Sequence, residues 1–233
     1  MHTKKPFKQP PKKFHPKGIT ILYEDWDILV IDKSAGLLTI STDRTREQTA
    51  YYLLTDYVRK GNSKSKNRIF IVHRLDRDTS GLLVFAKSEK AKRFLQDEWS
   101  NFEKKYTAVV QGILTQKEGI LSNYLAENQA HKMYVVGDPR KGKQAKTAYR
   151  VLKESTTHSL LEINLLTGRK NQIRVQFTHI GHPVAGDKKY GEREKNCKRL
   201  CLHSTSLKLV HPFSKEPMSF EATVPTYFNS FIR

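Results

Sequence analysis

The sequence predicts an α+β fold, in which a mostly antiparallel mixed sheet is flanked by a few helices. Strand-like runs outnumber helical runs, and the two kinds do not alternate regularly along the chain. No glycine-rich dinucleotide-binding turn follows any of the strand signals. A doubly wound parallel sheet would require that alternation, so the pattern favours segregated strands and helices. At 233 residues the chain can bury a core without disulfides or metal ions.

The strand signals are short runs rich in β-branched and other apolar residues. They occupy 19–23, 28–31, 69–72, 82–85, 106–110, 145–152, 160–166, 200–209 and 218–224. The first two runs flank a polar turn and predict a hairpin. The third and fourth enclose the polar segment 73–81, which must then be a connecting loop.

Three segments carry apolar residues at helical spacing, namely 47–60, 88–102 and 171–179. The first ends at Gly61, a residue type that commonly follows a helix. Ser88 is expected to cap the second helix, whose inner face would include Trp99.

Composition divides the chain into a basic arm, residues 1–18, and a single domain, residues 19–233. The arm is rich in Lys, Pro and His and has no acidic residue, a composition that resists folding. We expect it to be flexible, and a functionless extension is the alternative to a role in binding nucleic acid non-specifically.

The net charge indicates a polyanionic partner. The chain has 42 Lys and Arg against 23 Asp and Glu, a formal charge of +19. Such an excess attracts nucleic acid, and a membrane surface is the weaker alternative because no basic amphipathic helix stands out. Basic clusters at 59–68, 140–146 and 188–199 could bind phosphates.

Cysteine use and hydropathy predict a cytoplasmic protein. Only Cys197 and Cys201 are present, too few for a disulfide framework. No apolar run has the length needed to span a bilayer, and no signal peptide is apparent. The two cysteines with His203 could be metal ligands, but their spacing is unusual and a fourth ligand is not obvious. We therefore expect a packing or backbone-hydrogen-bonding role for His203 and no metal site.

The loop 73–81 concentrates His, Arg, Asp, Thr, Ser and Gly between two apolar strands, which is where a scaffold commonly holds reactive groups. The alternative is an ion-paired turn, in which Asp76 and Asp78 pair with Arg74 and Arg77. Composition alone leaves both possibilities open.

The run IVHRLDRDTSGLL at 71–83 resembles the signature of the RluA-type pseudouridine synthases. Further segments resemble the same family in the same order: DKSAGLL at 32–38, KKYTA at 104–108, LTGRKNQIR at 166–174, GHP at 181–183 and GDKKYG at 186–191. The resemblance extends from about residue 19 to 224. The sequence departs from the family pattern at Ser34, where proline is usual, and at Asn171 and Gln176, where histidine is common.

The resemblance implies a pseudouridine-synthase-like fold with an active-site cleft across the sheet, and a stand-alone catalytic domain without an S4 domain. It also implies site-specific isomerisation of uridine to pseudouridine. Asp76 would be the catalytic carboxylate and Tyr106 the active-site tyrosine, and Arg74 would fill the space left by the extruded uridine. The remaining expected site residues are Arg174, which is catalytic, and His73, Thr79, Arg169 and Gln172, which bind substrate.

The chemistry of this reaction explains the residue types. Moving uracil from an N1 to a C5 linkage involves no net redox change and no group donor, so we expect no cofactor. The carboxylate either attacks covalently or takes a proton from the sugar, and in both cases it must start ionised. A guanidinium such as that of Arg174 would keep Asp76 ionised and orient it by a forked hydrogen bond. Tyr106 could stack on the flipped base and exchange a proton at C5.

The expected substrate is structured RNA, with a stem-loop of ribosomal RNA favoured and transfer RNA as the other possibility. We expect a monomer with no obligate protein partner and no membrane association. Two other classes compete with an enzyme of this kind. One is a non-catalytic RNA-binding or ribosome-assembly factor on the same fold. The other is a metal-dependent nuclease, which is disfavoured because no cluster of carboxylates lies near the motifs.

Overall fold

The computed structural model describes residues 11, 15–41, 46–192, 194 and 197–233. Most of the predicted basic arm therefore lies outside the described residues. The chain divides into two compact units. The first unit comprises the described part of Met1–Asn101 together with Leu209–Phe220, and the second comprises Phe102–Lys208 and Glu221–Arg233. The prediction of one catalytic domain over 19–233 stays a prediction.

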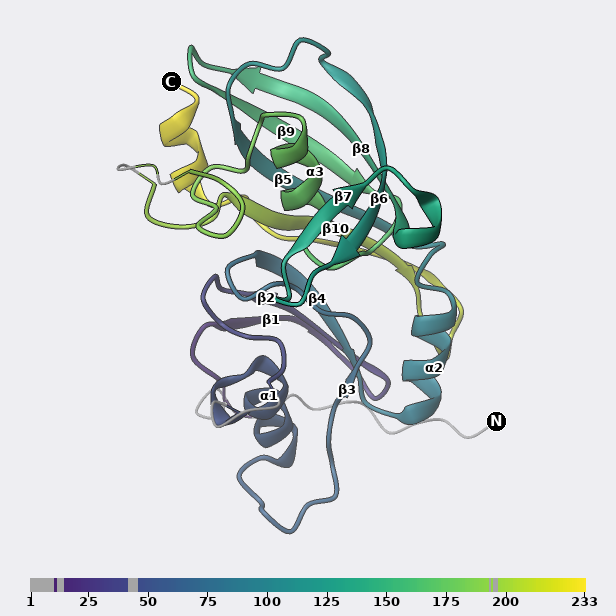
Figure 1. Ribbon diagram of the computed structural model, residues 1–233. Coiled ribbons are helices and arrows are strands. Elements are labelled where there is room, and N and C mark those ends of the chain that lie inside the picture. Colours follow the sequence, from purple (N-terminus) through teal and green to yellow (C-terminus); the bar gives the residue numbers. More distant parts are fainter. Residues whose placement is uncertain (1–10, 12–14, 42–45, 193, 195–196) are drawn as a thin grey trace. The chain divides into compact units, whose positions relative to one another are not determined.

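Both units combine antiparallel strands with a small number of helices (Figure 1), which confirms the predicted α+β class. The elements up to residue 101 are β1 (Ile19–Glu24), β2 (Ile28–Lys33), η2 (Arg46–Gln48), α1 (Ala50–Arg59), β3 (Phe70–Ile71), β4 (Ser80–Ala86) and α2 (Glu89–Asp97). The elements that follow are β5 (Glu103–Gln111), β6 (Glu118–Glu127), β7 (Met133–Val136), η3 (Pro139–Lys141), β8 (Lys143–Glu154), β9 (His158–Leu165), α3 (Gln172–His179), β10 (Leu202–Val210), β11 (Pro217–Glu221) and η4 (Thr226–Phe231).

The sheet of the first unit has the order β1-β2-β4, with β3 pairing the other side of β4. The predicted hairpin is formed by β1 and β2, and β2 pairs β4 with Ile31 opposite Leu83. Residues 28–31 and 82–86 are completely buried. Because both faces of these strands are covered, their sequences are continuous apolar runs and not alternating ones.

A buried carboxylate ties α1 to the sheet of the first unit. Glu24, at the end of β1, accepts hydrogen bonds from the Tyr57 hydroxyl of α1 at 2.7 Å and from Lys87 Nζ at 2.8 Å. Burial, and then the neighbouring Glu24 carboxylate, raise the pKa of Tyr57, so its hydroxyl stays a donor. The sequence prediction did not include this network, because its members are far apart along the chain.

The first two helices are shorter than predicted. Helix α1 begins at Ala50, because the Thr49 side chain accepts a hydrogen bond from Tyr52 N and residues 46–48 form a separate 3-10 turn. Helix α2 is capped by Ser88 as expected but ends at Asp97. Beyond it, Trp99 N bonds to Gln96 O, a turn of the tighter 3-10 type.

The second unit contains the antiparallel order β10-β5-β9-β8-β6-β7. Strands β6 and β7 were missed by the sequence prediction. Ile120 of β6 is 63% exposed, and most of this strand lies on the surface, so its apolar residues do not mark one buried face. Helix α3 packs against β6 and β7, and η4 packs against β5.

Among the described residues, none of the helices is both long enough and apolar enough to cross a bilayer.

His203 of β10 gives the second unit a predictable pH dependence. Burial, and then the charge of Arg199, lower the pKa of His203 to about 4, although a hydrogen bond with the Ala222 backbone opposes the shift. The unfolded chain has an ordinary histidine pKa near ~6.5. Between these two values only the unfolded state binds the proton, so stability falls as pH falls.

We expect His203 to contribute a slope of up to about 1.4 kcal/mol of unfolding free energy per pH unit between pH ~6.5 and ~4. Chemical denaturation at several pH values should show this slope in the wild type and a shallower one in His203→Gln. An identical slope in both proteins would mean that His203 does not titrate as its burial requires.

Candidate active site

The loop that carries Asp76 joins β3 to β4 in the first unit and is fixed through its main chain. Thr39 makes two bonds to one residue of this loop: its hydroxyl donates to Leu75 O at 2.9 Å and accepts from Leu75 N at 3.2 Å. Gly36 N donates to Arg77 O at 2.9 Å. Leu75 itself is buried. The loop is therefore held on both sides of Asp76.

Lys33 is completely buried and holds the same loop. Its Nζ donates to Ser34 O at 3.0 Å, Leu37 O at 2.8 Å and Arg77 O at 3.1 Å. A lysine ammonium has three N–H donors, so these three carbonyls match its capacity. The segment 32–38, which resembles the first family motif, thus acts as a brace for the loop of the second motif.

The same loop carries His73, Arg74 and Thr79, the residues expected to bind substrate beside Asp76. His73 is stacked on Trp99, with ring centroids 4.1 Å apart, and its Nε2 accepts a hydrogen bond from Val84 N at 3.1 Å. An accepting Nε2 requires a neutral ring with the proton on Nδ1. Thr79 is buried, Asp76 is half-buried and Arg74 is exposed. Exposure leaves Arg74 able to reach a ligand.

The ion-paired turn is present in part. Arg77 Nε lies 3.1 Å from Asp78 Oδ1, and both side chains are exposed. A pair of this kind contributes little to stability. Asp78 therefore has an ordinary surface role, which makes it a natural control for Asp76.

Tyr106 lies in the middle of β5, in the second unit, and is buried. It stands opposite Ser204 of β10 and Ile163 of β9. Central position in an antiparallel sheet fixes the direction in which its side chain leaves the strand.

Arg174 of α3 forms a forked ion pair with Asp187. Its Nε donates to Asp187 Oδ2 and its Nη2 to Asp187 Oδ1, both at 2.7 Å. Arg174 is 6% exposed and Asp187 is 1% exposed. Asp187 Oδ1 also accepts from the backbone N–H groups of Lys189 and Tyr190. A buried guanidinium held by a fork cannot rotate freely, so its remaining N–H groups point in a fixed direction.

The segment that carries Asp187 is tied to β5, the strand of Tyr106. Ala185 N donates to Val109 O, and Gln111 N donates to Pro183 O, both at 2.9 Å. Gly186 has a φ of +72°, and a Cβ there would collide with Arg199 O and approach Cys197 Sγ at 2.6 Å. Only glycine fits that position.

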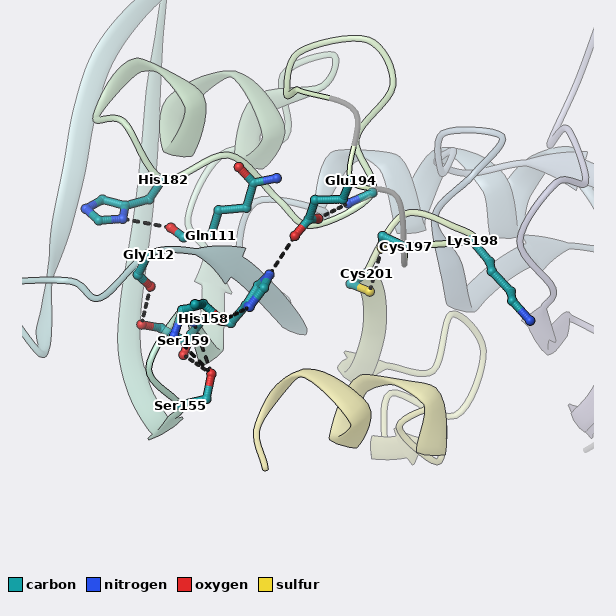
Figure 2. A network of polar contacts seen from close by, with 12 residues as sticks. Gln111, Gly112, Ser155, His158, Ser159, His182, Glu194, Cys197, Lys198 and Cys201 are labelled. Atoms are coloured by element: carbon teal, nitrogen blue, oxygen red, sulfur yellow. Dashed lines mark hydrogen bonds and ion pairs between the residues drawn. The ribbon is translucent and has the colours of Figure 1, made fainter.

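A second attachment holds this segment farther along the chain. Glu194 Oε1 lies 2.7 Å from His158 Nε2 of β9, and Glu194 Oε2 accepts from Gly186 N at 3.2 Å (Figure 2). Cys197 and Cys201 lie nearby with their sulfur atoms 3.9 Å apart. Glu194 therefore connects β9 to the residue preceding Asp187.

Two of the expected substrate-binding residues lie where α3 begins: Arg169 is in the loop before the helix and Gln172 is its first residue. The Gln172 amide is buried: its Nε2 donates to Lys146 O and Thr147 Oγ1, and its Oε1 accepts from Thr167 Oγ1 and Arg169 N. These four bonds use the full capacity of a primary amide. Gln172 thus shapes the turn, and its direct contact with RNA stays a prediction. Arg169 is exposed, with Nε donating to Gln144 O.

The two positions near α3 that depart from the family pattern are both engaged inside the second unit. Asn171 Oδ1 accepts from the Tyr190 hydroxyl at 2.9 Å. Gln176 is completely buried, and its Oε1 accepts from Thr147 Oγ1 at 2.7 Å while its Nε2 donates to three oxygen atoms. These substitutions are accommodated by internal hydrogen bonds.

One cluster in the first unit has donor atoms close enough to hold a cation, namely Asp25, Asp27 and His211. Asp25 is already occupied by protein groups, because it accepts from Tyr23 Oη, Asp27 N, Ile28 N and His211 Nε2. The cluster therefore serves as a hydrogen-bonded turn between β1 and β2.

Sequence reasoning missed two residues that position the others, Asp187 and Lys33. Both lie in segments that resemble family motifs, and a signal existed for each. Gly186-Asp187 combines a turn glycine with a carboxylate, and Lys33 follows a fully apolar strand. The structure joins Arg174 to Asp187 and ties their segment to the strand of Tyr106. The grouping of Asp76 with Tyr106 and Arg174 stays a prediction.

Comparison with known proteins agrees with these observations. A family model described as RNA pseudouridylate synthase matches residues 27–179. An uncharacterized RNA pseudouridine synthase from Mycoplasma genitalium is 33% identical over 220 residues, covering 92% of this chain and 70% of that protein. A ribosomal large subunit pseudouridine synthase D from Nitrosomonas europaea is 36% identical over 220 residues, covering 89% of this chain and 62% of that protein.

A solved structure supports the fold. The human RNA pseudouridylate synthase domain containing 4 protein superimposes with a TM-score of 0.74, at 22% identity, with 90% of each chain covered. At 22% identity this structural similarity shows a shared fold. The family model and the relatives from Mycoplasma genitalium and Nitrosomonas europaea show similarity of sequence. On the combined strength of the 27–179 match and the relatives at 33–36% identity, the chain belongs to the RNA pseudouridylate synthase family and is an isomerase.

Proposed function

We propose that this chain converts specific uridines of ribosomal RNA to pseudouridine, with Asp76 as the catalytic carboxylate. The observation that carries the proposal is the loop of Asp76, whose main chain is fixed by Thr39, Gly36 and Lys33 while the Asp76 side chain stays half-buried. A family match over this loop supports the same assignment. The ribosomal substrate rests on relatives such as the large subunit synthase of Nitrosomonas europaea.

A fixed main chain suits the chemistry expected of Asp76. Attack on the sugar or base, or removal of a sugar proton, needs a carboxylate held within a few tenths of an ångström of its reactive geometry. Hydrogen bonds to the backbone on both sides of Asp76 provide this without using the carboxylate oxygens. In the proposed reaction the carboxylate of Asp76 acts on the extruded nucleotide.

Arg174 and Tyr106 complete the proposed set. Asp187 orients the Arg174 guanidinium, which would favour the ionised form of Asp76 and bind it through N–H groups other than the two that Asp187 occupies. Tyr106 would supply a ring for stacking and a hydroxyl for exchange of the C5 proton. In this arrangement Asp187 is a positioning residue and does not touch the substrate.

Several further features stay predictions. We expect the protein to act in the cytoplasm as a monomer without an obligate protein partner, on a stem-loop in which the target base is extruded at low cost. His73, Arg74 and Thr79 are expected to contact the RNA beside Asp76. A non-catalytic RNA-binding factor on the same fold is the competing function, and the Asp76 variant below separates the two.

Asp76→Asn removes the charge with almost no change in size. We expect pseudouridine formation to fall by about a thousandfold or more, because the amide can neither attack nor accept the proton. RNA binding and unfolding temperature should stay close to wild type. The matched control is Asp78→Asn, which removes the neighbouring exposed carboxylate and should retain turnover.

The measurement is pseudouridine mapping by chemical labelling and primer extension. Total RNA would come from cells lacking the chain and from cells complemented with wild type, Asp76→Asn or Asp78→Asn. Restoration of the lost sites by Asp76→Asn would contradict the assignment of Asp76. Loss of sites in transfer RNA alone would contradict the ribosomal substrate.

Asp187→Asn should reduce both stability and turnover. Breaking a buried ion pair leaves an uncompensated charge, at a cost of about 3–5 kcal/mol of unfolding free energy. Displacement of Arg174 should lower the turnover number by about a hundredfold. The double variant Arg174→Met/Asp187→Asn should regain most of the stability, because it removes both buried charges and keeps an oxygen acceptor for the backbone N–H groups of Lys189 and Tyr190, but it should stay inactive. Turnover in a stable double variant would show that Arg174 is structural only.

Lys33→Met should loosen the Asp76 loop. Three carbonyls lose the donor that a buried lysine provides, so we expect a loss of about 3 kcal/mol of unfolding free energy. We also expect a lower turnover number with little change in RNA affinity. Lys90→Met, on the exposed face of α2, serves as the control for removing a lysine. Hydrogen exchange of the loop amides would test the brace directly, and unchanged protection in Lys33→Met would refute it.

A further inference from the structure

A groove of about 650 Å³ in the second unit is rimmed by basic side chains. Arg140 and Lys141 come from η3, between β7 and β8, and Lys143 is the first residue of β8. Arg169 and Lys170 come from the loop before α3. All the residues that line it belong to the second unit. Its volume is typical of sites that bind a small ligand, roughly 300–1,000 Å³.

Part of this positive charge has no acidic partner. Arg140 pairs with Asp138 at 3.1 Å, and Lys170 pairs with Glu127 at 2.5 Å. Lys141 and Lys143 are exposed, and within the described residues no carboxylate pairs with either. Arg169 uses its Nε to bond Gln144 O, and its terminal N–H groups have no acceptor in the described part of the chain. A concave surface with uncompensated cations attracts phosphates.

Apolar side chains form another part of the lining, which we call the floor of the groove. It includes Leu125 and Met133, which are buried, and Ala126. A charged rim over an apolar floor fits a nucleic-acid strand whose phosphates lie at the rim and whose bases or sugars lie on the floor. In a duplex the bases are stacked and face each other, so an unpaired strand is the form that can use the floor.

Among the described residues, Glu127 is the one acidic residue that lines this groove. Its carboxylate bonds to Lys170 Nζ and lies 3.0 Å from His131 Nδ1. Glu127 therefore neutralises part of the rim and would repel a phosphate. Removing the Glu127 charge should therefore strengthen RNA binding, whereas removing the basic charges of the rim should weaken it.

We propose that this groove binds an unpaired segment of the RNA substrate, with phosphates on Lys141, Lys143 and Arg169 and a base or sugar on Leu125 and Met133. The inference rests on the proposed function for the identity of the polyanion. The groove would be a second RNA-contact area, in addition to the site that holds the reacting nucleotide. Arg169 lies shortly before Arg174 in the same loop and helix, so the same segment would serve both binding and catalysis.

The test compares charge reversals in the full-length protein with a short labelled oligouridine and with a fully paired RNA duplex. Lys141→Glu/Lys143→Glu should weaken oligouridine binding about tenfold and reduce the slope of log affinity against log salt by about 1.4, because each contact to a single-strand phosphate contributes roughly 0.7. Lys90→Glu/Lys153→Glu is the matched control, since both lysines are exposed and lie outside the groove. It should leave the slope unchanged. Glu127→Gln should tighten binding by about threefold.

Equal losses in the groove and control variants, or no tightening in Glu127→Gln, would overturn the assignment of this surface. An equal loss on the duplex would overturn the requirement for an unpaired strand. Lys141→Glu/Lys143→Glu should also raise the KM for the RNA substrate, because the groove contributes to binding. If the wild type forms no pseudouridine while the reversal still weakens oligouridine binding, the proposed function fails and the groove assignment stands.

Discussion

Buried charges that must be satisfied by fixed partners determine how the site residues of this protein are held. Lys33 has no access to solvent, and its three N–H groups bond three carbonyls, one of them in the loop of Asp76. Arg174 is almost equally buried and is forked onto Asp187. Desolvated ions of this kind are costly unless every donor and acceptor is matched. Meeting that condition fixes the loop in one unit and the helix in the other.

The contacts around Lys33 restrain a backbone segment, whereas the contacts around Arg174 restrain a side chain. In the first unit the backbone of the catalytic loop is restrained, through Thr39, Gly36 and Lys33, and the Asp76 side chain stays half-buried. In the second unit a side chain is restrained, because Asp187 holds the guanidinium of Arg174 and the Gly186 turn and Glu194 hold Asp187 in turn. A restrained site loses less entropy when the substrate is positioned for reaction.

The residues proposed to bind the RNA strand differ from those proposed to carry out the reaction. The groove between the β7–β8 turn and the loop before α3 offers charge and an apolar floor, which suit a flexible strand without a fixed sequence. Asp76, Tyr106 and Arg174 are instead buried or half-buried side chains. Contacts of this kind outside the reacting nucleotide contribute salt-sensitive affinity whatever the sequence of the strand.

The sequence by itself determined the α+β class, most of the strands and the family, because apolar runs and the order of the motifs are local properties of the chain. It placed Asp76 on a loop for the same reason. It did not determine strands β6 and β7, in which only Leu125 and Met133 are buried and the other apolar residues are partly or fully exposed. Nor could it show that Gln172 is occupied internally, that Asp187 holds Arg174 or that Lys33 braces residues 75–77. Those facts are hydrogen bonds, several of them between residues distant along the chain, and only the tertiary structure decides which donor meets which acceptor.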